Sequence, residues 1–540
     1  MLNGTEAEER RYLEIILKKL RQALEKIDEK ISTSYREVIQ AKKYMWENMA
    51  AIDPAERAAN RVDVSLAIDF GEKAVDKRRK IHKLIQSPYF GRVDFIGDNE
   101  AEAKPFYIGV HSFAEDNGHE NLIYDWRSPV SGIFYDFGVG KAYYTSPSGL
   151  VNGEIRRKRQ YKIKDGTMEY MLESSLNIND DVLQKELSRT TDEKMKNIVA
   201  TIQKEQNTII RNETSNVLII QGVAGSGKTS IALHRVAFLL YRFKDTLTSR
   251  NVLILSPNKV FSDYISNVLP ELGEEPIAEA SLEELAAREL AGVCKFQTFS
   301  QQVSELLDTA DDAMIQRMKY KASPNFVNEL DSFLEHIDSQ YYVPADISID
   351  SVFISQDELL RSFQATKGMP LKQRLDKTAS VIAAGKRDAD GQKLTPSTTR
   401  KVKSAIAKML PFQNVISLYK QFYLDIGKPE MFQWKRAKTL EYADVFPLIY
   451  MKNYFEGTTS YEDMKHLVVD EMQDYTPVQY AVLSKLFPCK KTILGDGGQS
   501  VNPYTSSSLA EIRNAFPKRT SSSFSRAIVR PFKFRISHKK

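Results

Sequence analysis

One stretch of the chain carries the strongest structural signal: Val217-Leu-Ile-Ile-Gln-Gly-Val-Ala-Gly-Ser-Gly-Lys-Thr-Ser-Ile-Ala-Leu-His234. The apolar run at its start, Val217 to Ile220, is typical of a short buried strand, and a helical pattern continues to Leu240. The turn between them has the spacing Gly222-x-x-x-x-Gly227-Lys228-Thr229. This spacing, between a strand and a helix, predicts a phosphate-binding loop.

Such a loop works because glycines let successive backbone N–H groups point into one concave anion site at a helix N-terminus. Lys228 would add a positive charge for the β- and γ-phosphates of ATP, and Thr229 would offer a hydroxyl to Mg²⁺. A plain turn between strand and helix is the alternative, but it needs neither side chain at these positions. We expect the nucleotide to be held by Gly222, Val223, Ala224, Gly225, Ser226, Gly227, Lys228, Thr229 and Ser230.

A second apolar run, Leu467-Val-Val, ends in the adjacent carboxylates Asp470 and Glu471. Asp470 would hold Mg²⁺, and Glu471 would orient and activate the attacking water. A third run, Lys491-Thr-Ile-Leu494, leads into Gly495-Asp496-Gly-Gly-Gln499-Ser500. Gln499 at a strand end can sense the γ-phosphate, with a plain turn as the alternative. Catalysis would therefore involve Lys228, Glu471 and Gln499.

The order strand–loop–helix–strand predicts an α/β fold of the P-loop NTPase class, with a parallel sheet covered on both faces. We assign residues 179–270 and 463–515 to this core and residues 271–462 to a mostly helical insert. Within the insert, residues 367–408 are rich in Lys and Arg. They predict a mobile basic loop that contacts phosphate backbones, with a solvated linker as the alternative.

Residues 1–87 predict an antiparallel helical hairpin with its tip near Asp53-Pro54. The first helix, Glu6–Asn48, would be about 60 Å long at 1.5 Å per residue. Its apolar positions form a heptad seam typical of a coiled coil, and a second set follows after the tip. The alternative to a projecting arm is a helical pair packed inside a globular domain. The first set is Leu13, Leu17, Leu20, Leu24, Ile27 and Ile31; the second is Val62, Leu66, Phe70 and Ile81.

Residues 88–178 predict a small antiparallel β module, because short β-like runs alternate with Gly and Pro. The expected strands are Phe106–Val110, Asn121–Tyr124, Gly132–Tyr135, Lys141–Tyr144 and Arg159–Ile163. Two features stand out within the module. Asp125-Trp-Arg-Ser-Pro129 is interpreted as structural, and the basic cluster Arg156–Arg159 as a solvated turn rather than a nucleic-acid site.

Composition describes an ordinary soluble protein: the 540 residues are 27% charged and 42% apolar, with a net charge of +5. A balance this close to neutral is no argument for nucleic acid by itself. The two cysteines, Cys294 and Cys489, match neither a metal-site nor a disulfide spacing. With no signal segment and no membrane-spanning run, we expect a cytoplasmic monomer that does not bind membranes.

Four stretches in this order resemble the Q motif and motifs I, II and III of superfamily 1 helicases of the UvrD and Rep type. They are Gln206, the phosphate loop, Asp470-Glu471-x-Gln473-Asp474 and Gly495-Asp496-x-x-Gln499-Ser500. Ser256-Pro-Asn258 and Thr298-Phe299 resemble motifs Ia and Ib, which contact single-stranded DNA in that superfamily.

The likeness is more particular to the HelD family, and it covers nearly all of the chain up to about Phe516. It rests on the N-terminal hairpin, the long insert, Asp125–Pro129, Arg159-Gln-Tyr161 and Gln499-Ser-Val-Asn-Pro-Tyr504. HelD proteins are helicase-like ATPases that bind bacterial RNA polymerase and release it from stalled or post-termination complexes.

This resemblance implies that Gln206 reads the adenine edge and that Gln499 couples the nucleotide state to movement. It also implies that the hairpin enters the secondary channel of the polymerase, while the insert enters the main channel and opposes bound nucleic acid. Two other functions stay open. One is a UvrD-type DNA helicase that translocates on single strands, and the other is a non-catalytic protein that occupies the polymerase.

The chain departs from the family pattern after Tyr504, where motif IV, commonly Tyr-Arg-Ser, and motif VI should supply arginines to the γ-phosphate. Residues 516–540 instead form a basic tail interpreted as disordered or aberrant. Codons exist for Arg526–Lys539 that spell a motif IV-like Tyr-Arg-Ser one nucleotide out of frame. This favours truncation by a frameshift, which predicts weakened nucleotide binding, largely lost hydrolysis and a product prone to aggregation.

Overall fold

The computed structural model describes residues 4–48, 53–115, 120–173, 204–223, 225–257, 268–270, 272, 274–309, 311–350, 352–388, 390–458, 461–496 and 524–529. The chain divides into two compact units. The first comprises residues 1–212, 233–246 and 265–276, and the second comprises residues 213–232, 247–264 and 277–540.

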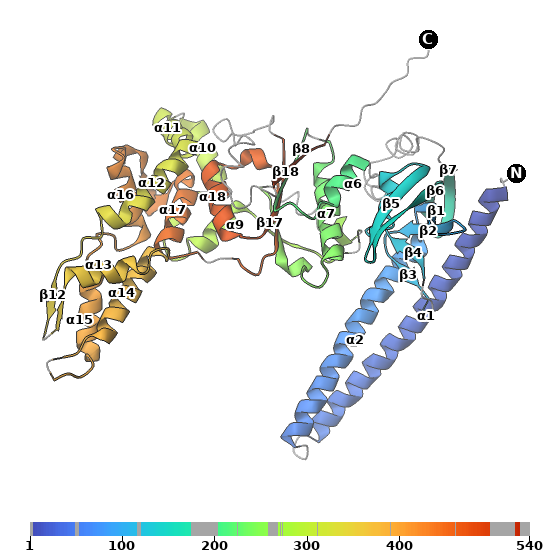
Figure 1. Cartoon of the computed structure of the whole chain (residues 1–540), viewed down its shortest axis with the longest axis horizontal. Coiled ribbons are helices and arrows are strands. Elements are labelled where there is room, and N and C mark those ends of the chain that lie inside the picture. Colours follow the sequence, from blue (N-terminus) through green and yellow to red (C-terminus); the bar gives the residue numbers. More distant parts are fainter. Residues whose placement is uncertain are drawn as a thin grey trace, which may run out of the picture. The chain divides into compact units, whose positions relative to one another are not determined.

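The first unit begins with two antiparallel helices, α1 (Gly4–Glu47) and α2 (Pro54–Gln86), which lie side by side in Figure 1. The predicted seam of α1 is confirmed near its start, where Leu13, Leu17 and Leu20 are buried. These residues belong to a core that includes Tyr89 and Tyr161 from the neighbouring sheet. The base of the hairpin is therefore part of a folded core, and apolar burial decreases toward the tip.

Of the four apolar positions predicted to line α2, Ile81 is buried as expected, but the other three are not. Val62, Leu66 and Phe70 are all more than half exposed. The buried and half-buried positions of α2 instead lie along another stripe of the helix, at steps of three, four and seven: Val64, Ala67, Gly71, Ala74 and Ile81. The small residues on this stripe have weaker hydropathy than their larger apolar neighbours, so the apolar pattern of the sequence did not reveal them.

A seven-stranded sheet follows the hairpin, in the order β3-β4-β2-β1-β6-β5, with β7 also paired to β6. All pairs are antiparallel except β2 with β4. The strands are β1 (Gly91–Gly97), β2 (Lys104–Gly109), β3 (Phe113–Ala114), β4 (Asn121–Asp125), β5 (Gly140–Ser146), β6 (Gly149–Lys164) and β7 (Thr167–Glu173). Helix α6 (Lys204–Ile210) also belongs to this unit.

Two local predictions in this unit are wrong. The strand expected at Gly132–Tyr135 is a short helix, α3 (Gly132–Asp136), because so short an apolar run suits a buried helix equally well. The basic cluster Arg156–Arg159 lies within β6 rather than in a turn. The guanidinium of Arg159 is buried and donates to Glu9 at 2.7 Å.

The interpretation of Trp126 and Arg127 as structural agrees with their surroundings. Trp126 is fully buried, and Arg127 forms an ion pair with Asp125 at 2.7 Å. Arg211, at the end of α6, donates to the carbonyl of Trp126 at 2.7 Å. This segment therefore connects β4 to α6 through buried polar contacts.

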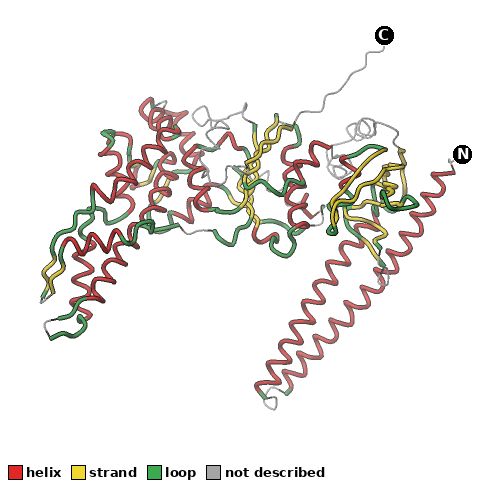
Figure 2. The backbone as a smooth tube through the Cα atoms, in the orientation of Figure 1, coloured by secondary structure: helices red, strands yellow, loops and turns green. Residues whose placement is uncertain are grey.

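The second unit contains a six-stranded sheet, visible as the central yellow strands of Figure 2. Its order is β10-β9-β16-β17-β8-β18, and every neighbouring pair is parallel. The strands are β8 (Val217–Gly222), β9 (Val252–Leu255), β10 (Ala278–Ala280), β16 (His466–Val469), β17 (Lys490–Gly495) and β18 (Phe524–Val529). Helix α7 (Lys228–Arg242) follows β8, as the sequence predicts.

The stretch between β10 and β16 is mostly helical. It contains α9 (Leu282–Glu289), α10 (Phe299–Thr309), α11 (Asp312–Lys321), α12 (Pro324–Gln340), α13 (Gln356–Gln364), α14 (Leu371–Gly385), α15 (Pro396–Ala407), α16 (Val415–Asp425) and α17 (Tyr442–Phe455), and α18 (Pro477–Leu486) follows β16. The short strands are β11 (Lys295–Phe296), β12 (Ile347–Ile349), β13 (Val352–Ile354), β14 (Trp434–Lys435) and β15 (Thr439–Leu440). Short 3₁₀ helices lie at Ser249–Asn251, Pro429–Met431, Arg436–Lys438 and Met472–Asp474.

Two further differences concern segments predicted to lack regular structure. Residues 367–408 are not a loop, because α14 and α15 pack through buried residues such as Ile382 and Val402. The C-terminal tail contains strand β18, which pairs in parallel with β8 from Phe524↔Val217 to Val529↔Gly222. No helix in the described part of the chain is long and apolar enough to span a bilayer.

Candidate nucleotide-binding site

The predicted phosphate loop connects β8 to α7 in the second unit. Gly225 and Gly227 have φ angles of 73° and 85°, a left-handed conformation that glycine adopts without steric cost. A hydrogen bond from the Ser226 N–H to the Val223 carbonyl, 3.1 Å long, closes the turn between them. Ala224 lies outside the described residues. The backbone path therefore favours glycine at positions 225 and 227.

The polar groups of two side chains in the loop have unusual surroundings. The ammonium of Lys228 donates to the carbonyls of Gly222 at 2.6 Å and Val223 at 3.1 Å, which holds the charge over the loop. The hydroxyl of Ser226 is buried and has no hydrogen-bond partner among the described residues. Thr229 and Ser230 lie in the first turn of α7. A helix N-terminus with this cation and this hydroxyl suits an anionic oxygen ligand.

Asp470 and Glu471 follow the end of β16, at the same edge of the sheet as the loop after β8, because the strands are parallel. The backbone N–H of Asp470 donates to the Leu255 carbonyl at 2.9 Å, and its side chain is only 5% exposed. Glu471 has a φ of 49° and a ψ of 54°, a left-handed conformation that is uncommon for a non-glycine residue. Strained backbone of this kind is frequent at functional sites.

Burial raises the pKa of Asp470 to about 7, and the negative charge of Glu471 acts in the same direction. A backbone hydrogen bond from Glu471 and the positive charge of Lys228 oppose the rise. Two adjacent carboxylates with too little positive charge nearby are a suitable site for a hard divalent cation. The donor set of Asp470 and Thr229 therefore fits the Mg²⁺ that the sequence predicts.

Gln473 links the end of β16 to the end of β17. Its amide nitrogen donates to Glu471 Oε2 at 2.8 Å, and its amide oxygen accepts from the Asp496 N–H at 3.0 Å. Gly495 makes this approach possible, since an added Cβ would lie 2.5 Å from Gln473 Oε1 and 2.4 Å from Met472 Cγ. Gln473 therefore holds the carboxylate of Glu471 in place.

The role of Gln473 was not predicted, although the residue belongs to a quoted motif. No local pattern indicates that it meets the end of β17, because the contact joins segments 23 residues apart. Gly495 also belongs to a motif, but its part in this contact was not predicted. The one sequence signal for it is a glycine at the end of an apolar run.

The described structure does not place two predicted site residues relative to this site. Gln206 is half-buried on α6, in the first unit, beside Asn207, which donates to Asp136 at 2.8 Å. Its contact with adenine stays a prediction. Gln499 lies outside the described residues, as do Asn258 and the stretch Ser500–Tyr504.

The motif Ia and Ib residues lie at other positions of the second unit. Ser256 directly follows β9 and is buried, with its N–H donating to the Ala280 carbonyl at 3.2 Å. Thr298 caps α10 through a 3.2 Å hydrogen bond from the Gln301 N–H. Phe299 is 39% exposed, and its ring packs edge-on against Tyr442. An exposed aromatic ring can stack on a nucleobase.

The family profile of the UvrD/REP helicase N-terminal domain matches residues 202–518, more than half of the chain. The chain therefore belongs to the UvrD/REP family of superfamily 1 helicases. The profile of the N-terminal domain of DNA helicase IV HelD matches residues 6–193, so the chain is a HelD-like member of that family. No curated protein matches the chain.

Proposed function

We propose that the chain binds ATP with Mg²⁺ on a RecA-like domain built on the six-stranded parallel sheet, which includes β10 and β18 beyond the predicted residues 179–270 and 463–515. We further propose that it acts on bacterial RNA polymerase, releasing or recycling it from nucleic acid. The observation that carries the first part is the placement of the phosphate loop and Asp470–Glu471 at one edge of a parallel sheet. Lys228 and Asp470 interact electrostatically across that edge.

Each residue has a distinct role in this proposal. The loop N–H groups, Lys228 and the Ser226 hydroxyl would bind the phosphates, while Thr229 and Asp470 would hold Mg²⁺, which neutralises developing phosphate charge. Glu471 would accept a hydrogen bond from the attacking water and take its proton. Gln473 keeps that carboxylate oriented. Gln206 would contact adenine, and Gln499 would couple the nucleotide state to movement.

The polymerase part rests on the hairpin and on the HelD profile match. The base of the hairpin packs into the core of the first unit. The half of α1 nearer the tip instead exposes large apolar side chains. Tyr35 is 71% exposed, Ile39 57% and Trp46 77%, and they fall on one stripe of α1. Exposed aromatic residues are enriched where proteins bind one another. The chemistry of the hairpin therefore favours a protein partner.

Nucleotide binding is tested by titrating a fluorescent ATP analogue into the chain with Mg²⁺. Lys228→Ala should weaken binding at least tenfold without changing the thermal midpoint. Glu471→Gln should bind as well as the wild type, because Glu471 acts on water rather than on phosphate. Equal binding by wild type and Lys228→Ala would exclude this site.

Polymerase binding is tested by co-purification with bacterial core RNA polymerase. Removing residues 1–87 would destroy the core of the first unit, so the informative variant is Tyr35→Ala, Ile39→Ala and Trp46→Ala combined. A matched control replaces three exposed apolar residues of the β module by alanine: Val139, Tyr143 and Leu150. The tip variant should lose binding and the control should keep it.

Translocation on single-stranded DNA is the second candidate, favoured by the exposed ring of Phe299. Phe299→Ala should then weaken binding of a single-stranded oligonucleotide while leaving polymerase binding unchanged. If the chain does not bind polymerase but binds the oligonucleotide through Phe299, translocation on single-stranded DNA replaces the polymerase proposal.

A further inference from the structure

Helix α10 packs into the second unit through a polar side chain and leaves apolar side chains at the surface. Gln302 is its only buried residue, and the amide oxygen of Gln302 accepts a 3.0 Å hydrogen bond from the Ala443 N–H. Leu307, by contrast, is 79% exposed, and Phe299 is 39% exposed. An amphipathic helix ordinarily buries its apolar face. Much of the apolar face of α10 is instead open to solvent.

This face combines an apolar stripe with a negative end. Phe299, Val303 and Leu307 follow one another at steps of four, so they form one stripe along the helix. The residues beyond the end of this α10 stripe are acidic and exposed: Asp308, Asp311 and Asp312. The C-terminus of a helix also carries partial negative charge, and no basic side chain lies in the last turn of α10. The surface therefore suits a helix with an apolar stripe and a positive end.

The chain itself contains such a helix. In α2, Val62, Leu66 and Phe70 are also spaced by four, and each is more than half exposed. Exposed lysines continue this α2 stripe toward the C-terminus of the helix: Lys73, Lys77 and Lys80. In both helices the three apolar positions span about 12 Å, at 1.5 Å per residue. The two stripes therefore match in spacing, and their ends are opposite in charge.

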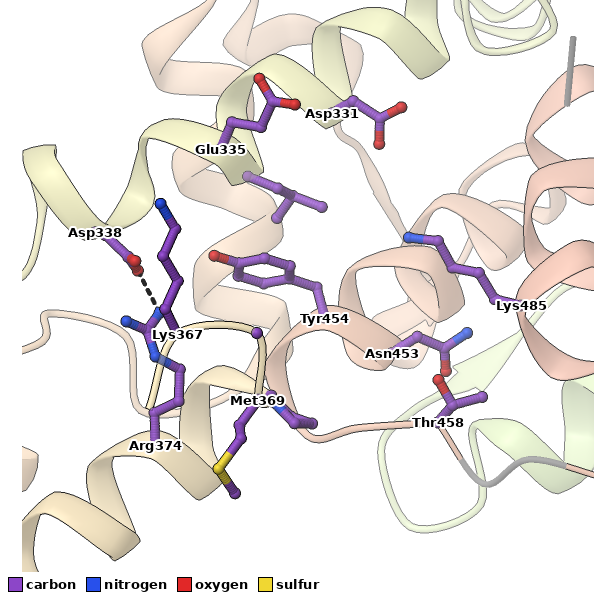
Figure 3. A pocket seen from close by; sticks show the side chains of 13 residues that line it. Asp331, Glu335, Asp338, Lys367, Met369, Arg374, Asn453, Tyr454, Thr458 and Lys485 are labelled. Carbon is purple, nitrogen blue, oxygen red and sulfur yellow. Dashed lines mark hydrogen bonds and ion pairs between the residues drawn. The ribbon is translucent and has the colours of Figure 1, made fainter. Parts of the chain in front are cut away.

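Other occupants and surfaces fit less well. A nucleic-acid backbone that extended from Phe299 toward Asp308 would meet carboxylates of its own sign. The cavity of about 800 Å³ in Figure 3 is lined by three carboxylates and three cations, and its Arg374 already pairs with Asp338 at 2.6 Å. That lining favours no class of ligand, whereas the α10 stripe favours a basic amphipathic helix.

We propose that α2 of one copy of the chain packs in parallel on α10 of a second copy. The α2 stripe then covers the α10 stripe, and Lys73 and Lys77 approach Asp308 and Asp312. Each copy carries both faces, so two copies can exchange this contact reciprocally. The self-association goes beyond the proposed function and differs from the monomer expected from the sequence. Because it covers Phe299, it keeps that ring from nucleobases while the copies are associated.

The first test is the molar mass of the full chain, measured by light scattering over about a hundredfold range of concentration. Wild type should exceed the 61.6 kDa of one copy, and the excess should grow with concentration. Leu66→Ala should weaken this association at least tenfold. Val75→Ala is the matched control, because Val75 is 42% exposed on the opposite side of α2. It should associate like wild type.

A charge exchange distinguishes this contact from unspecific aggregation. One variant carries Lys73→Glu with Lys77→Glu, and the other carries Asp308→Lys with Asp312→Lys. Each variant alone should keep the mass of one copy, because like charges meet at the contact. An equal mixture should associate again, since α2 of each variant then meets an α10 end of opposite sign. All four side chains are exposed, so the thermal midpoints should match that of wild type.

A wild-type mass of one copy at every concentration would overturn the proposal. So would wild-type association by either charge variant alone, or a mixture of the two that stays unassociated. Equal association by Leu66→Ala and Val75→Ala would also overturn it, and this comparison remains decisive if a charge variant fails to fold.

Discussion

Replacing Asp470 by asparagine should stabilise the chain in the absence of Mg²⁺. Burial raises the pKa of Asp470 to about 7, from an ordinary value of 3.8, so the folded chain binds this proton more tightly than the unfolded chain does. The resulting stability is complete below about pH 4 and is lost as the pH rises through about 7. The charged carboxylate therefore opposes folding at higher pH.

The magnitude follows from the size of the shift. Each pKa unit corresponds to about 1.4 kcal/mol, so the shift is equivalent to about 4 kcal/mol at most. Asp470→Asn has no charge to bury and should be more stable than wild type by up to that amount at about pH 8. The difference should shrink toward zero at about pH 4.

The assay is thermal unfolding across this pH range in the presence of a chelator. Asp463→Asn, an exposed carboxylate close in sequence, is the control and should show no pH-dependent gain. A variant no more stable than wild type at about pH 8 would refute the reasoning. Adding Mg²⁺ and ATP should stabilise wild type and leave Asp470→Asn almost unchanged, because the variant lacks the metal-binding carboxylate.

Three other substitutions test separate parts of the structure. Gly495→Ala should destabilise the second unit by about 1–3 kcal/mol, because the added Cβ would clash with Met472 and Gln473 of motif II. Gly138→Ala is the control, since no atom lies within 4 Å of its added Cβ. Differential scanning fluorimetry compares the two variants. Glu9→Gln removes the carboxylate charge that partly buried Arg92 and buried Arg159 share, and should cost about 3–5 kcal/mol in urea unfolding, while exposed Glu8→Gln should cost almost nothing. Asn207→Ala removes the 2.8 Å contact with Asp136 and should increase proteolysis around α6; unchanged cleavage would contradict that anchoring role.

The sequence predicted the elements whose signals are local. The β8–loop–α7 unit depends on a strand, glycines and a lysine that are contiguous, so its prediction was confirmed. Asp470 follows the same logic at the end of β16. The mixed α/β character and the parallel sheet of the second unit also followed from short apolar runs separated by helical patterns.

Features that depend on tertiary contacts escaped prediction. The seam of α2 uses Ala67 and Ala74, whose hydropathy is weaker than that of exposed Leu66 and Phe70. Gln473 bridges two strand ends, which no spacing in the sequence reveals. Strand β18 pairs with β8 across some three hundred residues, and pairings this remote leave little local signal.

The position of β17 has a geometric consequence for the nucleotide site. It lies between β8 and β16, so the phosphate loop and Asp470 are two strand spacings apart, roughly 10 Å. Adjacent strands, at roughly 4.8 Å, would leave no room for a phosphate group and a coordinated cation between lysine and carboxylate. β17 therefore acts as a spacer whose width matches the reactants. Gly495, at the end of β17, has no side chain there, so the amide of Gln473 can accept the hydrogen bond from the Asp496 N–H.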